Sequence, residues 1–321
     1  MEKKLYAAID NRKVAIVGAG FVGSSIAYAL TIRNLARDIV LIDINEERAR
    51  GEALDIQHGI SYMGASSVHA GTYADCANCD LIIITAGRPR RKGETRLDMI
   101  ADNIGIIRNV VTEIQKYYTH GVILVVSNPV DILTQKASEW MELPQGKVFG
   151  TGCILDTSRL IRKIADYTKL NTEAIKCYVV GEHGDTQFPV WSRLAIAGIP
   201  MDEYCSNVGL EWGPEQQDKL YTEVRSMGAS IISAKGRTHY GIATCVCSLA
   251  DAILNQRLTI APVTSPLDGE YGINNISISI PSIIGVNGVE HHLVEKWTED
   301  EVIKLKASAD RMRETLERIQ N

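Results

Sequence analysis

The chain has 321 residues, which is long for one hydrophobic core and favours two domains. Its 34 basic and 39 acidic residues give a formal charge of −5, a composition that offers no basic surface for nucleic acid or an anionic membrane. The sequence has no apolar run near the roughly 18–20 residues of a membrane span, and its N-terminus lacks the apolar core of a secretory signal. We therefore expect a cytoplasmic protein whose seven cysteines are reduced thiols.

The first predicted strand runs directly into a glycine-rich turn. Residues 14–17 are apolar, and Gly18, Gly20 and Gly23 follow with the spacing G-x-G-x-x-G before an apolar helical run that starts at Ser25. Gly18 allows a tight turn, Gly20 lets a pyrophosphate approach the backbone, and Gly23 lets helix and strand pack closely. The free N–H groups at the start of the helix, together with its dipole, attract phosphates.

The second predicted strand, residues 38–42, ends at Asp43, twenty residues after Gly23. An acidic side chain at this place suits the ribose hydroxyls of NAD, and its charge repels the 2′-phosphate of NADP. The two strands and the turn between them therefore predict a site for NAD. A glycine turn with a purely structural role is the alternative.

Further apolar strands alternate with helical segments in the first half of the chain. A polar helical stretch covers residues 46–62, and buried strands are predicted at residues 80–85 and 121–126. This alternation implies right-handed crossovers and a doubly wound parallel sheet, the Rossmann fold. Such a sheet binds ligands beyond the carboxyl ends of its strands. The residues that we expect at this edge are Gly18, Asp43, Thr85, Ala86, Gly87, Ser127 and Asn128.

The pattern changes after residue 150, so we predict a NAD-binding domain over residues 1–150 and a mixed α+β substrate domain over residues 151–321. Asn287 and Gly288 lie between apolar runs and predict a tight turn. Helices are predicted at residues 156–167, 214–235 and 241–254, and β-rich stretches around residues 177–180 and 273–286.

The last predicted helix opens with a capping box at Thr298 and Glu301. It carries one apolar stripe at helical spacing, which packs either on the body of the protein or on a partner subunit. The residues of this stripe are Val302, Leu305, Ala309, Met312, Leu316 and Ile319.

Three polar clusters lie outside the glycine turn. His183 stands between glycines after an apolar strand, and Asp156 and Arg159 are three residues apart, which places them on one helix face. Residues 88–96 include five basic side chains, with Pro89 and Gly93 as hinges, directly after Gly87. Taken singly, these features indicate a surface histidine, a local ion pair and a solvated loop.

Taken together, they complete a set of five motifs that resembles the lactate/malate dehydrogenase family. The motifs are residues 18–23, 93–98, 127–131, 155–159 and 181–186, and the resemblance runs from about residue 13 to the C-terminus. It implies an NAD-dependent 2-hydroxy acid dehydrogenase of fermentative glycolysis that forms a homodimer or homotetramer. We expect no metal, because neither Cys76 and Cys79 nor Cys245 and Cys247 have further ligands at zinc spacing.

The resemblance also assigns roles to individual residues. His183 is expected to donate the proton to the ketone oxygen, since imidazole titrates closest to working pH, and Asp156 to fix the tautomer of its ring. Arg159 is expected to hold the substrate carboxylate with two parallel hydrogen bonds, and Arg96 to polarise the carbonyl when the loop closes. Thr238 and Asn128 match residues that line the substrate pocket. The residues expected to contact NAD are Gly18, Gly20, Val22, Gly23, Asp43, Gly87, Ser127, Asn128 and Ile242.

The sequence gives two conflicting indications of the substrate. Arg90 stands where malate enzymes of the family carry an arginine that pairs with the second carboxylate of oxaloacetate. Burying that carboxylate without a partner would cost several kcal/mol. Glu94 with Thr95, Glu182 and Thr238 resemble the lactate enzymes. On balance we expect reduction of pyruvate to L-lactate. A malate dehydrogenase, or one with broad 2-hydroxy acid specificity, is the alternative.

Two further alternatives concern regulation and class. Some bacterial lactate enzymes are activated by a sugar bisphosphate, but the two positions that bind it hold Ile161 and Lys176 here, so we do not expect this activation. A NAD-binding protein without catalysis would explain the glycine turn and Asp43. It would leave His183 and Arg159 unexplained.

Overall fold

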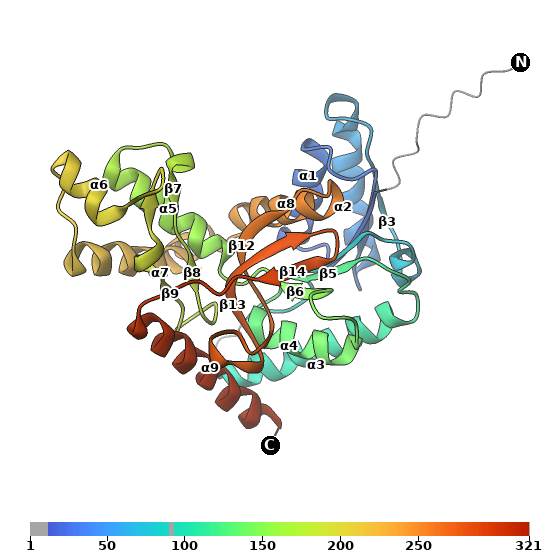
Figure 1. The fold of residues 1–321 in the computed structure, drawn as a ribbon. Coiled ribbons are helices and arrows are strands. Elements are labelled where there is room, and N and C mark those ends of the chain that lie inside the picture. Colours follow the sequence, from blue (N-terminus) through green and yellow to red (C-terminus); the bar gives the residue numbers. More distant parts are fainter. Residues whose placement is uncertain (1–11, 90–92, 321) are drawn as a thin grey trace, which may run out of the picture.

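The computed structural model describes residues 12–89 and 93–320 (Figure 1). Six parallel strands in the order β3-β2-β1-β4-β5-β6 form the first part of a nine-stranded sheet, and this is the predicted doubly wound fold. The strands are β1 (Lys13–Val17), β2 (Asp38–Ile42), β3 (Ser67–Ala70), β4 (Leu81–Ile84), β5 (Val122–Val125) and β6 (Val148–Gly150).

Helices cover both faces of this sheet, which explains why its strands are apolar at every position. Alternate residues of β1 belong to different cores: Val14 and Ile16 face one layer of helices, whereas Ala15 and Val17 face the other. The first layer consists of α1 (Phe21–Ile32), α2 (Glu46–Gly59) and α8 (Tyr240–Leu254). The second layer consists of α3 (Arg96–Gln115) and α4 (Val130–Met141).

Three antiparallel strands extend the sheet beyond β6: β12 (Thr259–Asp268), β13 (Asn274–Gly285) and β14 (Gly288–His292). Strand β12 joins β6 at the pair Thr264 and Gly150. The predicted turn at Asn287 and Gly288 connects β13 to β14, and Gly288 has a φ of +87°. The sheet therefore includes strands from both predicted domains, a connection that the sequence analysis missed.

A second group of elements packs beside the sheet around its own core (Figure 1). Helix α7 (Pro214–Lys235) has the predicted bounds, and α5 (Ile154–Thr168) and α6 (Met201–Val208) accompany it. Strands β7 (Ile175–Lys176), β10 (Ala195–Ile196) and β11 (Ile199–Pro200) form a small sheet. Strands β8 (Val179–Val180) and β9 (Phe188–Pro189) pair with each other.

The last helix, α9 (Glu299–Gln320), has the predicted capping box. The N–H of Thr298 donates to Glu301 Oε2 at 2.9 Å, and the N–H of Glu301 donates to Thr298 Oγ1 at 3.3 Å. Leu305, Ala309 and Met312 are buried in a core that they share with β13, so the apolar stripe packs on the body of the protein. Within the described ranges, the helices are too short or too polar to span a bilayer.

Candidate active site

In the glycine-rich turn between β1 and α1, Gly18 and Gly23 pack closely against neighbouring atoms, whereas Gly20 has free space beside it. Gly18 has a φ of +108°, and a Cβ there would lie 2.7 Å from Thr85 Oγ1. A Cβ on Gly23 would lie 1.9 Å from the carbonyl oxygen of Gly18, whereas at Gly20 the nearest atom would be Nη2 of Arg48 at 4.0 Å. The first and third glycines thus permit the tight turn, and the space beside Gly20 fits a pyrophosphate.

Asp43 lies across this turn at the end of β2. Its Oδ2 accepts a hydrogen bond from the N–H of Ala19 at 2.7 Å, and its Oδ1 accepts one from the N–H of Asn45 at 2.9 Å. Helix α1 has neither a side-chain cap at Gly20 nor an acidic residue in its first turn. Its first N–H groups are therefore available to an anion, and the carboxylate of Asp43 stands beside them.

The carboxyl ends of neighbouring strands meet at the same edge, as predicted. Thr85 Oγ1 donates to the carbonyl oxygen of Gly18 at 2.8 Å, which connects the ends of β4 and β1. Ser127 Oγ donates to the carbonyl oxygen of Ala86 at 2.6 Å, which connects β5 to β4. Gly87 and Asn128 are exposed at this edge.

His183, Asp156 and Arg159 form one hydrogen-bonded chain. His183 follows β8, and its Nδ1 donates to Asp156 Oδ2 at 2.6 Å. Arg159, one turn further along α5, donates from Nη1 to Asp156 Oδ1 at 3.0 Å. The Asp156 side chain is 3% exposed and that of His183 24%, so the carboxylate is enclosed and the imidazole is accessible.

Opposite charges set the protonation of this pair. Burial alone would lower the pKa of His183, but the charge and hydrogen bond of Asp156 outweigh burial and raise the pKa above its ordinary value. Burial would likewise raise the pKa of Asp156, but His183 and Arg159 lower it. The arrangement therefore favours an imidazolium beside a carboxylate, which is an acid ready to donate a proton.

A second carboxylate contacts the same histidine, and sequence reasoning gave it no role. Asp131, in the first turn of α4, is 1% exposed, and its Oδ2 accepts a hydrogen bond from the backbone N–H of His183 at 2.7 Å. Asp131 lies 52 residues before His183. The only signal in the sequence was the motif at residues 127–131, which does not reveal this contact.

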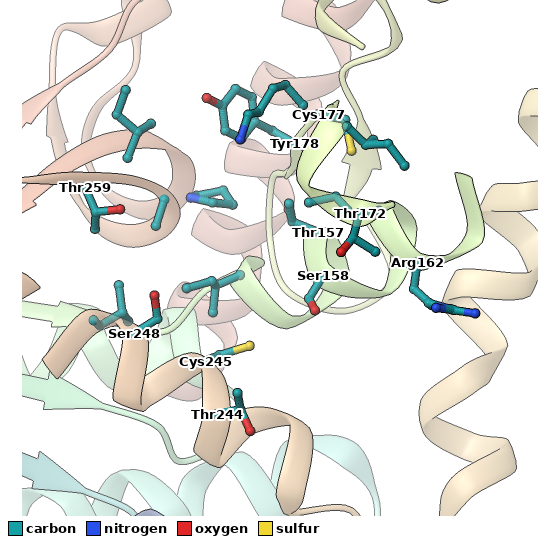
Figure 2. A pocket seen from close by; sticks show the side chains of 18 of the residues that line it. Thr157, Ser158, Arg162, Thr172, Cys177, Tyr178, Thr244, Cys245, Ser248 and Thr259 are labelled. Atoms are coloured by element: carbon teal, nitrogen blue, oxygen red, sulfur yellow. The ribbon is translucent and has the colours of Figure 1, made fainter. Parts of the chain in front are cut away.

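A pocket of about 1020 Å³ lies on the other face of α5 (Figure 2). Helix α5 contributes Ser158, Ile161 and Arg162 to it, while Asp156 and Arg159 face His183. Lys176 also lines the pocket. The two positions considered for a sugar bisphosphate, Ile161 and Lys176, therefore share a pocket that is separate from the hydrogen-bonded chain of His183, Asp156 and Arg159.

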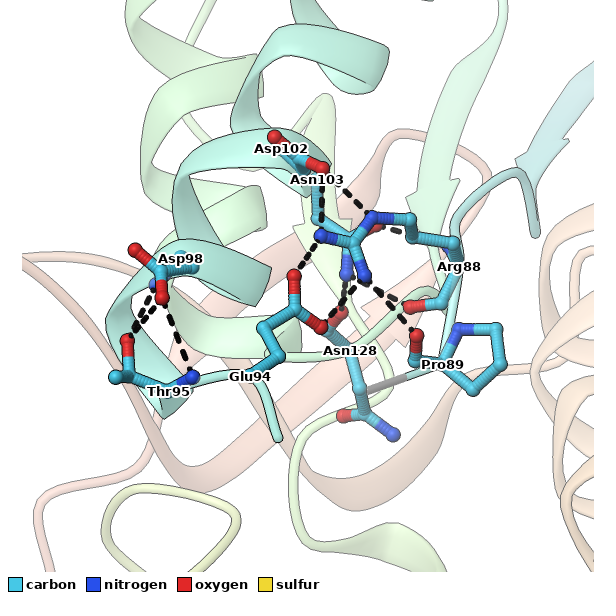
Figure 3. Close-up of polar contacts among 8 residues, drawn as sticks. All are labelled: Arg88, Pro89, Glu94, Thr95, Asp98, Asp102, Asn103 and Asn128. Atoms are coloured by element: carbon cyan, nitrogen blue, oxygen red, sulfur yellow. Dashed lines mark hydrogen bonds and ion pairs between the residues drawn. The ribbon is translucent and has the colours of Figure 1, made fainter. Parts of the chain in front are cut away.

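Beside the carboxyl edge of the sheet, Arg88 and Asn103 belong to a polar cluster near the start of α3 (Figure 3). Arg88 forms a two-point ion pair with Glu94, in which Nη1 donates to Oε2 at 2.8 Å, and its Nε donates to Asp102 at 2.8 Å. Asn103 is buried, accepts from the N–H of Arg88 at 2.9 Å, and donates to the carbonyl oxygens of Arg88 and Asn128 at 3.1 and 3.0 Å. Asn103 thus fixes the backbone of Asn128, a predicted pocket residue.

The other predicted site residues occupy separate elements. Arg96 is the first residue of α3, and Arg90 lies outside the described residues. Thr238 lies in the connection between α7 and α8, next to His239, whose Nδ1 is 2.9 Å from Ser25 Oγ on α1. Val22 and Ile242 are partly buried against the core on one face of the main sheet.

One group of possible metal ligands occurs among the described residues: Cys153, Asp156 and His183, with donor atoms within 4.8 Å of one another. Two of the three already bond to each other, and burial raises the pKa of the Cys153 thiol well above its ordinary value. Cys76 and Cys79, and likewise Cys245 and Cys247, are close in sequence, and all four are buried free thiols. Burial raises the pKa of each thiol to about 12.

Comparison with known proteins covers nearly the whole chain. A family model described as lactate/malate dehydrogenase, NAD binding domain, matches residues 12–150, and one described as lactate/malate dehydrogenase, alpha/beta C-terminal domain, matches residues 153–321. The L-lactate dehydrogenase of Acetivibrio thermocellus is 39% identical over 305 residues, 95% of this chain and 96% of its own. That of Priestia megaterium is 40% identical over 307 residues, 96% of both chains.

Solved structures agree with these sequence matches. The minor L-lactate dehydrogenase from Enterococcus mundtii superposes with a TM-score of 0.93 at 37% identity, over 96% of this chain and 98% of its own. A lactate dehydrogenase from a Medee basin deep-sea metagenome library gives a TM-score of 0.94 at 35% identity, over 98% of this chain and all of its own.

Proposed function

The chain belongs to the lactate/malate dehydrogenase family, and from this premise we propose that it is an NAD-dependent L-lactate dehydrogenase that interconverts pyruvate and L-lactate. The observation that carries the proposal is the chain of hydrogen bonds from His183 through Asp156 to Arg159. A protein that only binds NAD would have no use for a buried carboxylate that holds an accessible imidazole.

The cofactor would lie along the carboxyl edge of the sheet. The open side of Gly20 and the first turn of α1 would hold its pyrophosphate, and Asp43 would accept hydrogen bonds from ribose hydroxyls. Val22, Gly87, Ser127 and Ile242 would line the rest of the site. When bound, NADH supplies the hydride for the ketone carbon.

His183 would supply the proton. Because Nδ1 is held by Asp156, the atom available to the ketone oxygen is Nε2. Asp156 stabilises the protonated ring before the reaction and keeps the ring in place after the proton has left. In the oxidation of lactate, the same nitrogen would take the proton back.

Four residues would hold and polarise the substrate. Arg159 would pair with the carboxylate through two parallel hydrogen bonds, a geometry that lysine cannot reproduce. Arg96, at the start of α3, would stabilise the charge that develops on the ketone oxygen. Thr238 and the backbone-anchored Asn128 would complete the pocket.

Arg90 supports oxaloacetate as a second candidate substrate, since a guanidinium there could pair with a second carboxylate. The test is to measure kcat/KM with NADH for pyruvate and oxaloacetate, on the wild type and on Arg90→Gln. A preference for pyruvate that survives the substitution supports the lactate assignment. A preference for oxaloacetate that collapses in the variant makes the protein a malate dehydrogenase, and NADH binding without oxidation of NADH by either acid refutes catalysis.

The assembly and location are proposals that rest on the family resemblance: a homodimer or homotetramer in the cytoplasm. Sedimentation equilibrium of the purified chain tests the first. A single species with the mass of one chain, 35.3 kDa, would contradict it.

A further inference from the structure

Asp131 is a buried carboxylate whose position the proposed chemistry above does not explain. It lies in the first turn of α4, is 1% exposed, and accepts the backbone N–H of His183 at 2.7 Å through Oδ2. An exposed acidic residue in the first turn of a helix interacts favourably with the helix dipole, but only weakly. Burying a charge costs more than this interaction returns, so helix stability alone does not account for Asp131.

The charge of Asp131 is only partly compensated. Its Oδ1 makes no hydrogen bond of normal geometry within the described part of the chain, and the wholly buried side chain of Thr264 lies beside it. Burial raises the pKa of Asp131 to about 6, against the opposing effects of Thr264 and His183. Neutral pH is above this pKa, so the ionised form predominates there, and the charge of His183 stabilises that form.

We propose that Asp131 is a positioning residue for proton transfer, which fixes the backbone of His183 and stabilises its imidazolium with a second negative charge. Asp156 holds the ring from α5, and Asp131 holds the main chain of the same residue from α4. The inference rests on the proposed function, because it assumes that His183 is the proton donor.

The charges around His183 define the direction of the effect. Asp156 and Arg159 face it from α5 with opposite signs, and Asp131 faces it from α4. Glu182, on the same loop as His183, raises the pKa of Asp131 by its negative charge and accepts a hydrogen bond from Thr186 Oγ1 at 2.8 Å. Removal of the Asp131 anion leaves Asp156 as the main group that stabilises the imidazolium, so it lowers the pKa of His183.

The test is Asp131→Asn, whose amide oxygen can still accept the N–H of His183. Pyruvate reduction requires a protonated His183, so kcat/KM falls as the pH rises through the pKa of this residue. In Asp131→Asn we expect the midpoint of this fall at a pH about 0.5 unit or more below that of the wild type. At the acidic plateau, the kcat of the variant should stay within about fivefold of the wild-type value. Asp166→Asn, an exposed carboxylate further along α5, is the matched control and should leave the profile unchanged.

A second readout does not require turnover. Diethyl pyrocarbonate modifies neutral imidazole, so the pH dependence of its reaction at His183, followed by mass spectrometry of the peptide, reports the same pKa. If the wild type reduces neither pyruvate nor oxaloacetate, the proposed function fails while this titration still tests Asp131. Should Asp131→Asn not fold, Asp131→Ser is a smaller neutral variant with the same expected shift. A folded neutral variant with the wild-type labelling curve and rate profile would overturn the proposal.

Discussion

Asp156 Oδ2 and His183 Nδ1 are 2.6 Å apart, and this contact determines which nitrogen of the imidazole meets the substrate. The two residues are 27 positions apart and belong to different elements: His183 follows β8, whereas Asp156 lies in the first turn of α5. This contact is the main cause of both the lowered pKa of Asp156 and the raised pKa of His183. Each can be tested by removing one charge.

Asp156→Asn should lower kcat/KM for pyruvate by about 100-fold or more, because the amide neither stabilises the imidazolium nor selects the tautomer. The pKa of His183 is raised in the wild type, so pyruvate reduction is expected to fall only as the pH passes a value higher than the ordinary 6.5 of histidine. In Asp156→Asn this fall should move to lower pH. A stopped-flow or steady-state pH profile measures both effects, and an unchanged profile would refute the role of Asp156.

Arg159→Lys should retain the positive charge and lose the planar two-point contact with the substrate carboxylate. We expect kcat/KM for pyruvate to fall by about 100-fold or more, which corresponds to roughly 2.7 kcal/mol of transition-state stabilisation. The affinity for NADH, measured by fluorescence titration, should stay within about twofold. Arg162→Lys, on the opposite face of α5, is the matched control, and a similar loss there would show that the effect is structural.

The local elements of this fold could be predicted from the sequence because their signals are local. Gly18 and Gly23 have steric requirements that lie within one turn, and the capping box at Thr298 and Glu301 involves neighbours three residues apart. Pro214 at the first turn of α7 and Gly236 just after its end mark that helix on both sides. Residues at the ends of apolar strands could be assigned to one edge for a different reason, because the carboxyl ends of parallel strands in a doubly wound sheet lie at the same edge.

Long-range pairing could not be predicted in the same way. Strand β12 contains Pro262 and Pro266, and a proline in a run argues against a strand inside a sheet. Yet β12 lies inside the sheet, between β13 and β6. Pro262 is the register partner of Pro281, so the two residues that lack an N–H group stand opposite each other. The contact of Asp131 with His183 is equally hidden, since it joins a helix start to a loop with no shared motif.

Asn103→Ala should destabilise the protein and weaken substrate binding together. The buried amide makes three hydrogen bonds to the backbone of Arg88 and Asn128, and its loss leaves these groups without their partner. We expect about 1–3 kcal/mol of lost stability. The KM for pyruvate should rise, because the main chain of Asn128 is no longer fixed. Thermal unfolding and steady-state kinetics measure the two effects.

The control for this variant is Asn109→Ala, an exposed asparagine on the same helix α3. It removes an equal side chain without breaking the connection between β4, β5 and α3. A melting temperature for Asn103→Ala equal to that of Asn109→Ala would contradict the importance of the buried amide.

His292 should make the protein less stable in mild acid. It is 6% exposed in β14, and its ring nitrogens lie 3.0 Å from Ser282 Oγ and 3.2 Å from Ser265 Oγ. Burial lowers the pKa of His292 below its ordinary value of 6.5. The unfolded chain therefore takes up a proton at a higher pH than the folded chain does, so the free energy of unfolding decreases as the pH falls below 6.5.

The decrease ends once the pH is below the folded-state pKa, and each unit of difference between the two pKa values contributes about 1.4 kcal/mol. Denaturant unfolding of the wild type and His292→Gln at pH 7.5, 6 and 5 measures this contribution. The variant should lose less stability than the wild type over this range, although it starts from a lower value. His291→Gln, at the exposed neighbouring position, should keep the wild-type acid dependence. If the wild type and His292→Gln lose the same stability between pH 7.5 and pH 5, the buried imidazole does not cause the acid dependence. Another titrating group must then be responsible.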